Sequence, residues 1–251
     1  MKVYLISLAE DQHRREQMRK RFACNYEDFE HIEGIRLTNR NVLSQIYDIR
    51  NFDDNLTTPE LGCAISHTKA LEAFLASGAP YALILEDDAI GDDSDIAAIA
   101  NAIKQLPSDT FLLCGGQEGL RGQIYNYGRS TRIASVYQIP SIAKKFFTRA
   151  CCYCVTRPSA QRILTSQRKS LHLSDNWGRY FHAWTSFYYI KRIAHPLDLS
   201  DSNIERERAR SAPATELSRI YQDGIVTILH RLFSKILLRT LHRKLGLTRI
   251  E

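Results

Sequence analysis

Residues 59–89, PELGCAISHTKALEAFLASGAPYALILEDDA, decide the fold that this sequence predicts. Thr58 precedes a proline and a glutamate, the pattern of an N-cap followed by a first helical turn, and apolar residues then recur at helical spacing to about residue 77. A glycine and a proline end this helix. The apolar run YALIL at 81–85 is typical of a strand buried in a parallel sheet, and three acids follow it directly.

The sequence on either side continues the alternation of strands and helices. KVYLISL at 2–8 is a β-branched, apolar run, and the charged segment after it places Met18 and Phe22 on one helical face. Further expected elements are a strand at 29–32, a polar loop over 37–58, a helix at 96–106, strands at 110–116, 132–139 and 149–156, and a helix from Pro158. This alternation predicts an α/β fold whose mostly parallel sheet is flanked by helices.

Length and composition agree with one main globular core. The chain has 251 residues, of which 44% are hydrophobic and 25% charged, proportions that exclude a disordered, collagen-like or coiled-coil protein. No uncharged apolar stretch approaches the ~18 residues that a membrane-spanning helix needs. The N-terminal segment reaches charged residues too early for a signal peptide, so we expect a cytoplasmic protein.

The net charge of +6 is concentrated at one end of the chain. Residues 229–251 hold six Lys and Arg against Glu251, a local net charge of +5, so the remainder is almost neutral. A nucleic-acid enzyme would need a basic groove along much of its surface. We therefore expect no nucleic-acid partner.

The six cysteines lack the C-x-x-C spacing of a zinc ribbon. Three of them lie in the apolar run ACCYCV at 150–155, where alternate side chains face opposite sides of a strand and cannot meet at one metal. We expect the cysteines to be buried, reduced thiols, as is usual for apolar cysteines in the cytoplasm.

Glu86, Asp87 and Asp88 form the strongest candidate site. They follow an expected buried strand, and ligands of open α/β sheets bind at the carboxyl ends of the strands. Adjacent like charges are unfavourable unless a cation offsets them, and Mg²⁺ or Mn²⁺ bridging a diphosphate would do so. The alternative is a solvated acidic turn that caps the next helix, and spacing alone does not separate the two.

The preceding helix carries a second polar group. Ser66, His67 and Lys69 occupy about one turn and could present a hydroxyl, an imidazole and an ammonium to phosphate, while Cys63 lies one turn before His67. Gly62 would allow another backbone or a ligand to approach this helix closely. The alternative is a structural role for His67, which is the commoner fate of a lone helical histidine.

These motifs resemble those of one known family. The segment at 59–89 is similar to the signature of glycosyltransferase family 25, the bacterial lipooligosaccharide galactosyltransferases and their collagen-modifying relatives. VYLISLAEDQHRREQM at 3–18 resembles the family's N-terminal strand, and RACCYCVTRPSAQRIL at 149–164 resembles its later strand and helix. The resemblance covers roughly residues 2–205.

The resemblance implies a GT-A-like fold and an inverting transfer of a hexose, usually galactose, from a UDP-sugar to a carbohydrate acceptor. It implies that Asp88 ligates Mn²⁺ or Mg²⁺ and that Glu86 lies nearer the ribose or uracil. By this resemblance, together with the helix pattern that adds Lys69, the nucleotide-sugar-binding residues are Ser7, Arg14, Ser66, His67, Lys69, Glu86 and Asp87.

Inverting transfer needs a carboxylate that deprotonates the acceptor hydroxyl while the metal stabilises the departing UDP. Asp175 is the first candidate for this catalytic base, because Trp177 and Tyr180 beside it would be good platforms for a sugar ring. The alternative for Asp175 is an N-cap formed together with Ser174. Glu118 is the competing catalytic base, since it also follows an expected central strand.

The segment from 225 to 247 predicts a basic amphipathic helix, with apolar side chains on one side and basic ones on another. Such a helix can lie in the headgroup layer of an anionic membrane. The alternative is a helix packed on the core or on a second subunit of a homodimer. The sequence thus divides into a catalytic domain, residues 1–212, and a helical basic tail, residues 213–251.

The leading hypothesis is a metal-dependent galactosyltransferase that extends a lipooligosaccharide or lipopolysaccharide. Its partners would be a UDP-sugar, a lipid-linked oligosaccharide acceptor and an anionic membrane, with the protein peripheral on the cytoplasmic face of the bacterial inner membrane. The alternative from a different class is a non-catalytic UDP-sugar- or carbohydrate-binding protein on the same fold. Transfer of a labelled donor sugar separates the two hypotheses.

Overall fold

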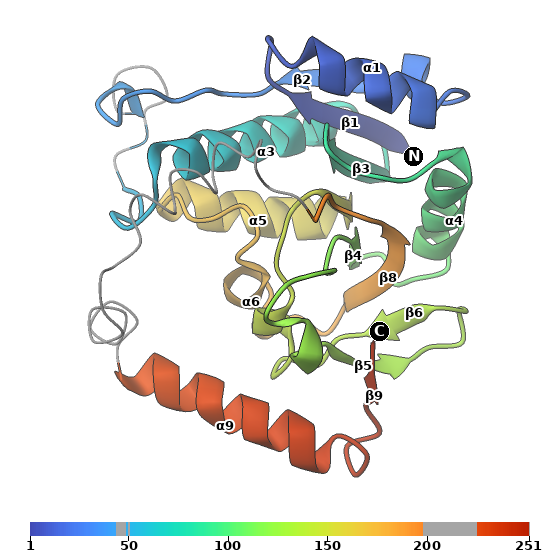
Figure 1. Cartoon of the computed structure of the whole chain (residues 1–251), viewed down its shortest axis with the longest axis vertical. Helices are drawn as coiled ribbons and strands as arrows, with labels where there is room; N and C mark the ends of the chain where they lie inside the picture. Colours follow the sequence, from blue (N-terminus) through green and yellow to red (C-terminus); the bar gives the residue numbers. More distant parts are fainter. Residues whose placement is uncertain (44–48, 50, 198–224, 251) are drawn as a thin grey trace.

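The computed structural model describes residues 1–43, 49, 51–197 and 225–250 (Figure 1). Over these residues the apolar runs form one nine-stranded sheet of order β2-β1-β3-β7-β4-β8-β6-β5-β9. The strands are β1 (Lys2–Ser7), β2 (Glu30–Glu33), β3 (Tyr81–Glu86), β4 (Phe111–Gly115), β5 (Tyr127–Ser130), β6 (Val136–Gln138), β7 (Cys152–Thr156), β8 (Phe187–Ile193) and β9 (Thr248–Arg249).

The sheet is mixed, and it is mostly parallel, as the sequence predicts, in the sense that six of its nine strands point one way. β1 is parallel to both β2 and β3, and β4 is parallel to β8, whereas β7 lies antiparallel between β3 and β4. Followed across the pairings, β1, β2, β3, β4, β5 and β8 point one way and β6, β7 and β9 the other. The carboxyl ends of the central parallel strands therefore meet at one edge. β7 begins at that same edge, with Cys152 opposite Leu85.

Helices cover both faces of this sheet (Figure 1). They are α1 (Gln12–Arg21), α3 (Thr58–Ala76), α4 (Asp93–Lys104), α5 (Arg157–Lys169), α6 (Trp177–Tyr180) and α9 (Ile225–Leu241), with short 3₁₀ turns at Tyr26–Asp28, Gln123–Tyr125 and Lys144–Phe146. Met18 of α1 and Ile99 of α4 share one buried cluster with Leu83, whereas Leu71 of α3 shares the opposite cluster with Ile84. Neighbouring strand residues thus supply two cores, because they face opposite sides of the sheet.

The start of α3 differs by one residue from the expected start. Its N-cap is Thr57 rather than Thr58, and the Thr57 side chain accepts a hydrogen bond from the Glu60 backbone amide. The Glu60 carboxylate in turn accepts from the Thr57 amide at 2.7 Å. This reciprocal capping box satisfies two backbone donors that a helix start leaves unpaired, which is why the helix begins one residue early.

The described C-terminal residues belong to the same sheet and core. β9 pairs antiparallel with β5, and Leu238, Leu247 and Ile250 are part of the larger buried cluster. The predicted domain boundary between residues 212 and 213 lies outside the described residues. Within the described part of the chain, no helix is both long and apolar enough to cross a bilayer.

The cysteines are free thiols, as expected, but their burial differs. Cys114 and the three cysteines of the ACCYCV run are buried. Cys24 is exposed and Cys63 is half-buried, so the expectation that all six are buried is wrong for these two. Cys24 follows the end of α1 at the surface, and Cys63 faces a cavity beside α3.

Candidate active site

A cavity of about 450 Å³ opens at the carboxyl edge of β1 and β3. Its walls come from the ends of these two strands, the start of α1, segment 34–38 and the first half of α3. The volume falls within the range of pockets that hold a small ligand, roughly 300–1,000 Å³. It is lined by all the predicted nucleotide-sugar residues except Lys69, and by the predicted metal ligand: Ser7, Arg14, Ser66, His67, Glu86, Asp87 and Asp88.

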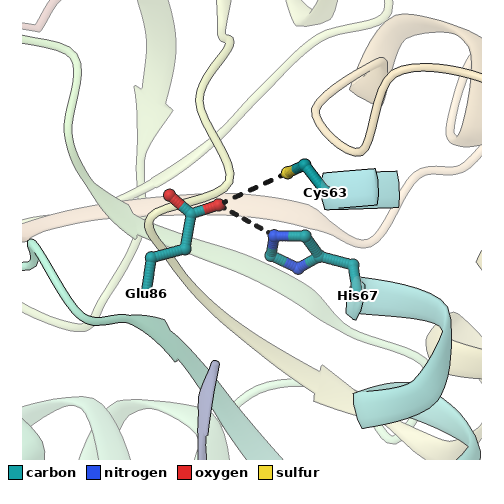
Figure 2. Close-up of side chains that lie close together, drawn as sticks. All are labelled: Cys63, His67 and Glu86. Carbon is teal, nitrogen blue, oxygen red and sulfur yellow. Dashed lines mark hydrogen bonds and ion pairs between the residues drawn. The ribbon is translucent and has the colours of Figure 1, made fainter. Parts of the chain in front are cut away.

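His67 joins α3 to the end of β3 inside this cavity (Figure 2). Its Nε2 lies 2.8 Å from Glu86 Oε1, and its Nδ1 lies 3.0 Å from the hydroxyl of Tyr153 on β7. The thiol of Cys63, one turn earlier on α3, donates weakly to the same Glu86 oxygen at 3.9 Å. Because His67 is 3% exposed and paired at both ring nitrogens, it does have a structural role, and that role holds Glu86 in the cavity wall.

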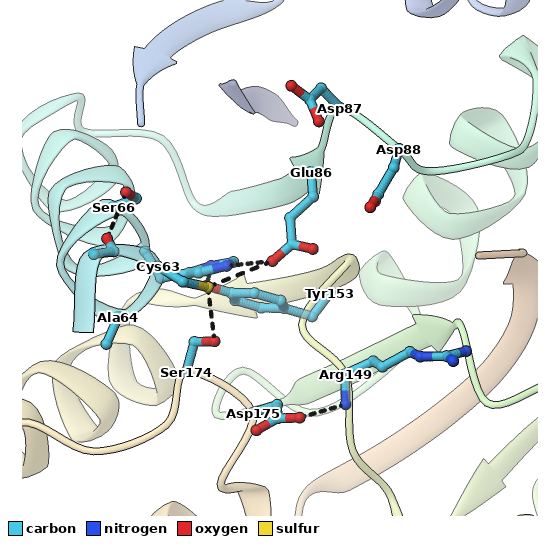
Figure 3. A network of polar contacts seen from close by, with 12 residues as sticks. Cys63, Ala64, Ser66, Glu86, Asp87, Asp88, Arg149, Tyr153, Ser174 and Asp175 are labelled. Carbon is cyan, nitrogen blue, oxygen red and sulfur yellow. Dashed lines mark hydrogen bonds and ion pairs between the residues drawn. The ribbon is translucent and has the colours of Figure 1, made fainter. Parts of the chain in front are cut away.

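Asp87 leaves β3 in a different direction from Glu86 (Figure 3). It is 7% exposed and pairs with Arg14 of α1, whose Nη1 lies 3.1 Å from Asp87 Oδ1. Burial raises the pKa of Asp87 to about 6, although a hydrogen bond from Ser7 and the charge of Arg14 act in the opposite direction. Ser7 and Arg14, which the resemblance assigns to nucleotide binding, therefore lie beside the acidic motif.

Asp88 lies against His195, a residue that the sequence analysis missed. His195 Nε2 is 3.4 Å from Asp88 Oδ2, and Arg14 Nη1 is 3.7 Å from the same oxygen. Burial alone would raise the pKa of Asp88, but the hydrogen bond and charge of His195 and the charge of Arg14 lower it, so the carboxylate is ionised. The sequence signal that could have found His195 is its position shortly after the aromatic run FYYI at 187–190, which is typical of a strand. This run forms β8, whose carboxyl end reaches the same edge as β3.

The donor set around Asp88 fits a hard divalent cation. Asp88 Oδ1 is buried and has no hydrogen-bond partner among the described residues. An ionised oxygen with a free lone pair, beside a cavity that three further carboxylates line, is the kind of ligand that Mg²⁺ and Mn²⁺ take. Asp88 would hold such an ion, and the remaining positions would be left to water and to the oxygens of a bound ligand.

Ser66 and Lys69 do not present their polar groups together. Ser66 Oγ donates to the Gly62 carbonyl and accepts from the Ile35 amide, each at 2.8 Å, so it fixes segment 34–38 against α3. Lys69 was predicted to bind the nucleotide sugar, but it lies outside the cavity and donates to the Glu33 carbonyl at 2.9 Å. Two residues along a helix correspond to about 200° of rotation, so Lys69 cannot share the face of His67.

The two candidate bases are linked to each other but are not among the residues that line the cavity. The Asp175 carboxylate accepts from the backbone amide of Arg149 at 2.8 Å (Figure 3). The Arg149 guanidinium donates to the Glu118 carbonyl at 2.9 Å. Glu118 Oε2 is buried with no hydrogen-bond partner in the described part of the chain. Both carboxylates remain candidates for the base, and neither is placed beside the acidic motif by these contacts.

Two expectations about the surroundings of Asp175 are wrong. The N-cap of α6 is Asn176, which makes no side-chain capping hydrogen bond, so Asp175 is not the N-cap of this helix. Trp177 and Tyr180 are 1% and 2% exposed, and Trp177 packs 4.6 Å from the ring of Phe111. These aromatic side chains are core residues, because large rings gain most from complete burial, and they offer no face to a sugar.

Two comparisons address the sequence as a whole. The family model of glycosyltransferase family 25 (LPS biosynthesis protein) matches residues 1–176. No curated protein sequence matches the chain.

Solved structures with a similar arrangement share little sequence with this chain. TarS 1–349 from S. aureus is 9% identical with a TM-score of 0.46, over 97% of this chain and 73% of TarS. Its complex with UDP-GlcNAc is 10% identical with a TM-score of 0.46, over 93% and 73% of the two chains. The galactosyltransferase LgtC, in complex with donor and acceptor sugar analogues, is 10% identical with a TM-score of 0.37, over 87% of this chain and 99% of LgtC.

Proposed function

The chain belongs to glycosyltransferase family 25, and from this premise we propose that it transfers a hexose, galactose in the first instance, from a UDP-sugar to a lipooligosaccharide or lipopolysaccharide acceptor with inversion at the sugar carbon. The family description, LPS biosynthesis, supports this class of acceptor. The resemblance of the acidic motif to the family's metal and nucleotide motif supports a UDP-sugar donor. We propose Mn²⁺ or Mg²⁺ as the cofactor.

The observation that carries this proposal is the composition of the cavity. Arg14 is a cation in contact with Asp87 and near Asp88 Oδ2, and the other oxygen of Asp88, Oδ1, is a buried acceptor with no hydrogen-bond partner among the described residues. A diphosphate needs positive charge from the protein and from a metal, and both can be supplied within this one space. Glu86, held by His67, offers a carboxylate oxygen to the hydroxyls of a ribose.

The residues of the cavity would divide the chemistry of transfer among them. A divalent cation held by Asp88 would supply charge neutralisation for the departing diphosphate. Arg14 would orient the phosphates from the side of α1 and add a second positive charge. Asp175 or Glu118 would take the proton from the acceptor hydroxyl as it attacks the sugar carbon.

The exposed face of α9 supports a lipid-linked acceptor and a peripheral position on an anionic membrane. Four large apolar side chains on this helix are 49–62% exposed: Leu229, Leu232, Phe233 and Ile236. Leu238 instead joins the core, and Lys235 and Arg239 stack over the ring of Tyr125 beside it. An apolar face bordered by cations fits anionic lipid, and we propose that α9 docks the protein on the cytoplasmic face of the membrane.

A donor screen tests the proposed activity. The full chain is incubated with Mn²⁺, a lipooligosaccharide acceptor and a set of UDP-sugars, and released UDP is measured together with the anomeric configuration of the product. Asp88→Asn should lower turnover by about 100-fold or more, because stabilising a departing diphosphate is worth several kcal/mol. Asp92→Asn is the matched control, since Asp92 is an exposed N-cap outside the cavity and asparagine also caps helices.

A second candidate function is non-catalytic binding of a UDP-sugar. It is favoured by one observation: neither candidate base lines the cavity that would hold the nucleotide. This candidate predicts tight UDP binding with no acceptor-dependent UDP release for any donor. A product in which the transferred sugar keeps the anomeric configuration of the donor would confirm transfer but contradict the inverting mechanism.

A further inference from the structure

Three potential metal ligands other than Asp88 converge on the cavity wall (Figure 2). Cys63, His67 and Glu86 each offer one ligand atom, and these atoms all lie within 4.8 Å of one another. Cys63 and His67 are four residues apart on α3, so their side chains leave the same face of the helix. Glu86 is the last residue of β3 and meets them from the sheet.

We propose that Cys63, His67 and Glu86 form a binding site for a borderline-soft divalent ion, with Zn²⁺ as the best match. Thiolate and imidazole ligands favour zinc, whereas Mg²⁺ and Mn²⁺ take sets of oxygen ligands. Three protein ligands with a fourth position open are the pattern of reactive rather than structural zinc sites. This site is separate from the cation assigned to Asp88 and goes beyond the proposed transfer activity.

The separations between the ligand atoms fit such an ion after a small movement. Zinc bonds of about 2.0–2.3 Å in a tetrahedron place two ligand atoms roughly 3.3–3.8 Å apart. Cys63 Sγ and Glu86 Oε1 lie 3.9 Å apart, close to that range. His67 Nε2 and Glu86 Oε1 lie 2.8 Å apart because a proton is shared between them. Replacing this proton by an ion requires these two atoms to separate by roughly half an ångström, which side-chain torsions of Glu86 can provide.

The two softer ligands already have outer hydrogen-bond partners. The hydroxyl of Tyr153 lies 3.0 Å from His67 Nδ1, and Ser174 Oγ lies 3.3 Å from Cys63 Sγ (Figure 3). Burial raises the pKa of Tyr153, so its oxygen remains a neutral hydroxyl that can accept from Nδ1. Such partners fix the tautomer of a ligating histidine and support a ligating thiolate.

The proton balance of binding follows from these contacts. The Cys63 thiol loses its proton to solvent, and the resulting thiolate accepts from the Ser174 hydroxyl. The ring proton that neutral His67 shares with Glu86 moves from Nε2 to Nδ1, where it is donated to the Tyr153 hydroxyl, and the Nε2 lone pair becomes the ligand. Thiolate and carboxylate together balance the two charges of the ion, and one proton is released per ion bound. Because all three ligands line the cavity, the fourth position faces space for water or for a ligand oxygen.

Cobalt substitution tests this site. The metal-free full chain is titrated with Co²⁺, because a cobalt–thiolate bond gives a near-ultraviolet charge-transfer absorption, and Zn²⁺ is then added to displace it. We expect a band that saturates at one ion per chain, is lost in Cys63→Ser and is kept in Cys24→Ser, a matched change of an exposed thiol outside the cavity. Tyr153→Phe and Ser174→Ala keep all three ligands and should weaken affinity roughly tenfold.

A second readout needs no variant. Zn²⁺ should slow alkylation of Cys63 in the unmodified chain and leave alkylation of Cys24 unchanged, as measured by mass spectrometry. The proposal is overturned if Co²⁺ gives no thiolate band, if Zn²⁺ gives no protection, or if the band survives in Cys63→Ser and disappears in Asp88→Asn. A protein that keeps the band but transfers no sugar would leave this site intact and contradict only the proposed function.

Discussion

Replacing Gly62 by alanine tests how closely segment 34–38 approaches α3. An added Cβ would lie less than 3.0 Å from the Ile35 carbonyl oxygen and 3.3 Å from the Leu37 amide nitrogen. Both are backbone atoms, so no rotamer change relieves the clash and the segment must move outward. Overpacking of this kind costs up to about 3 kcal/mol, whereas alanine stabilises an open helical position by about 1 kcal/mol relative to glycine. The cost of the clash exceeds the gain in helix propensity, so we expect Gly62→Ala to lower the free energy of unfolding by about 2 kcal/mol.

The same movement should weaken nucleotide binding. It strains the hydrogen bond from the Ile35 amide to Ser66, worth about 1 kcal/mol, which corresponds to about fivefold in affinity. Urea unfolding and calorimetric titration with UDP measure the two effects. Gly78→Ala is the control, because Gly78 has a φ of 73° and no neighbour within 4 Å, so it should lose stability without changing UDP affinity. A Gly62→Ala protein that is more stable than the parent and binds UDP equally well would refute the close approach.

Three further predictions concern other parts of the chain. Asp175→Asn or Glu118→Gln, whichever removes the catalytic base, should lower turnover by about 10²–10⁴-fold with unchanged UDP affinity. If both variants turn over as fast as the parent protein, neither residue is the base. Burial lowers the pKa of Lys144 to about 8, so between pH 8 and 10.5 the unfolded chain binds more protons than the folded one and stability rises with pH. In urea unfolding, the stability of the parent relative to Lys144→Met should therefore rise by about 2 kcal/mol from pH 7.5 to 9.5, and a constant difference would contradict this shift. Leu232→Ser combined with Phe233→Ser should abolish sedimentation with anionic vesicles but spare activity on a soluble acceptor, and loss of dimerisation instead of vesicle binding would favour a second subunit as the occupant of this face.

The central part of the fold could be predicted because its signals are local. The capped start of α3, its glycine end and the apolar run of β3 all lie within residues 57–86, and each agrees with the others. The α/β class and the mostly parallel sheet follow from repetition of this pattern. The antiparallel placement of β7 could not be read from its composition, since an apolar strand buried on both faces looks the same in either direction.

The acidic part of the candidate site was predicted from one stretch of sequence, and Ser7, Arg14 and His67 on other elements were named through the family resemblance, whereas His195 was missed. Glu86, Asp87 and Asp88 follow one strand, so their common position at the cavity needs no long-range information. His195 reaches Asp88 only because β8 ends at the same edge as β3, which depends on strand order. Lys69 was misplaced because sharing one helical turn is not the same as sharing one helical face.

The antiparallel direction of β7 has a consequence for protein engineering. A strand that runs this way presents the segment before it, residues 147–151, to the ligand edge and sends the helix after it, α5, to the other end of the sheet. The carbonyl of Cys151, the last of these residues, accepts a hydrogen bond from the Glu86 amide at 2.9 Å, so we expect substitutions at 147–151 to affect the ligand edge and substitutions in α5 to affect mainly stability. The two stretches are adjacent in the chain but lie at opposite ends of β7, so they can be varied in separate libraries.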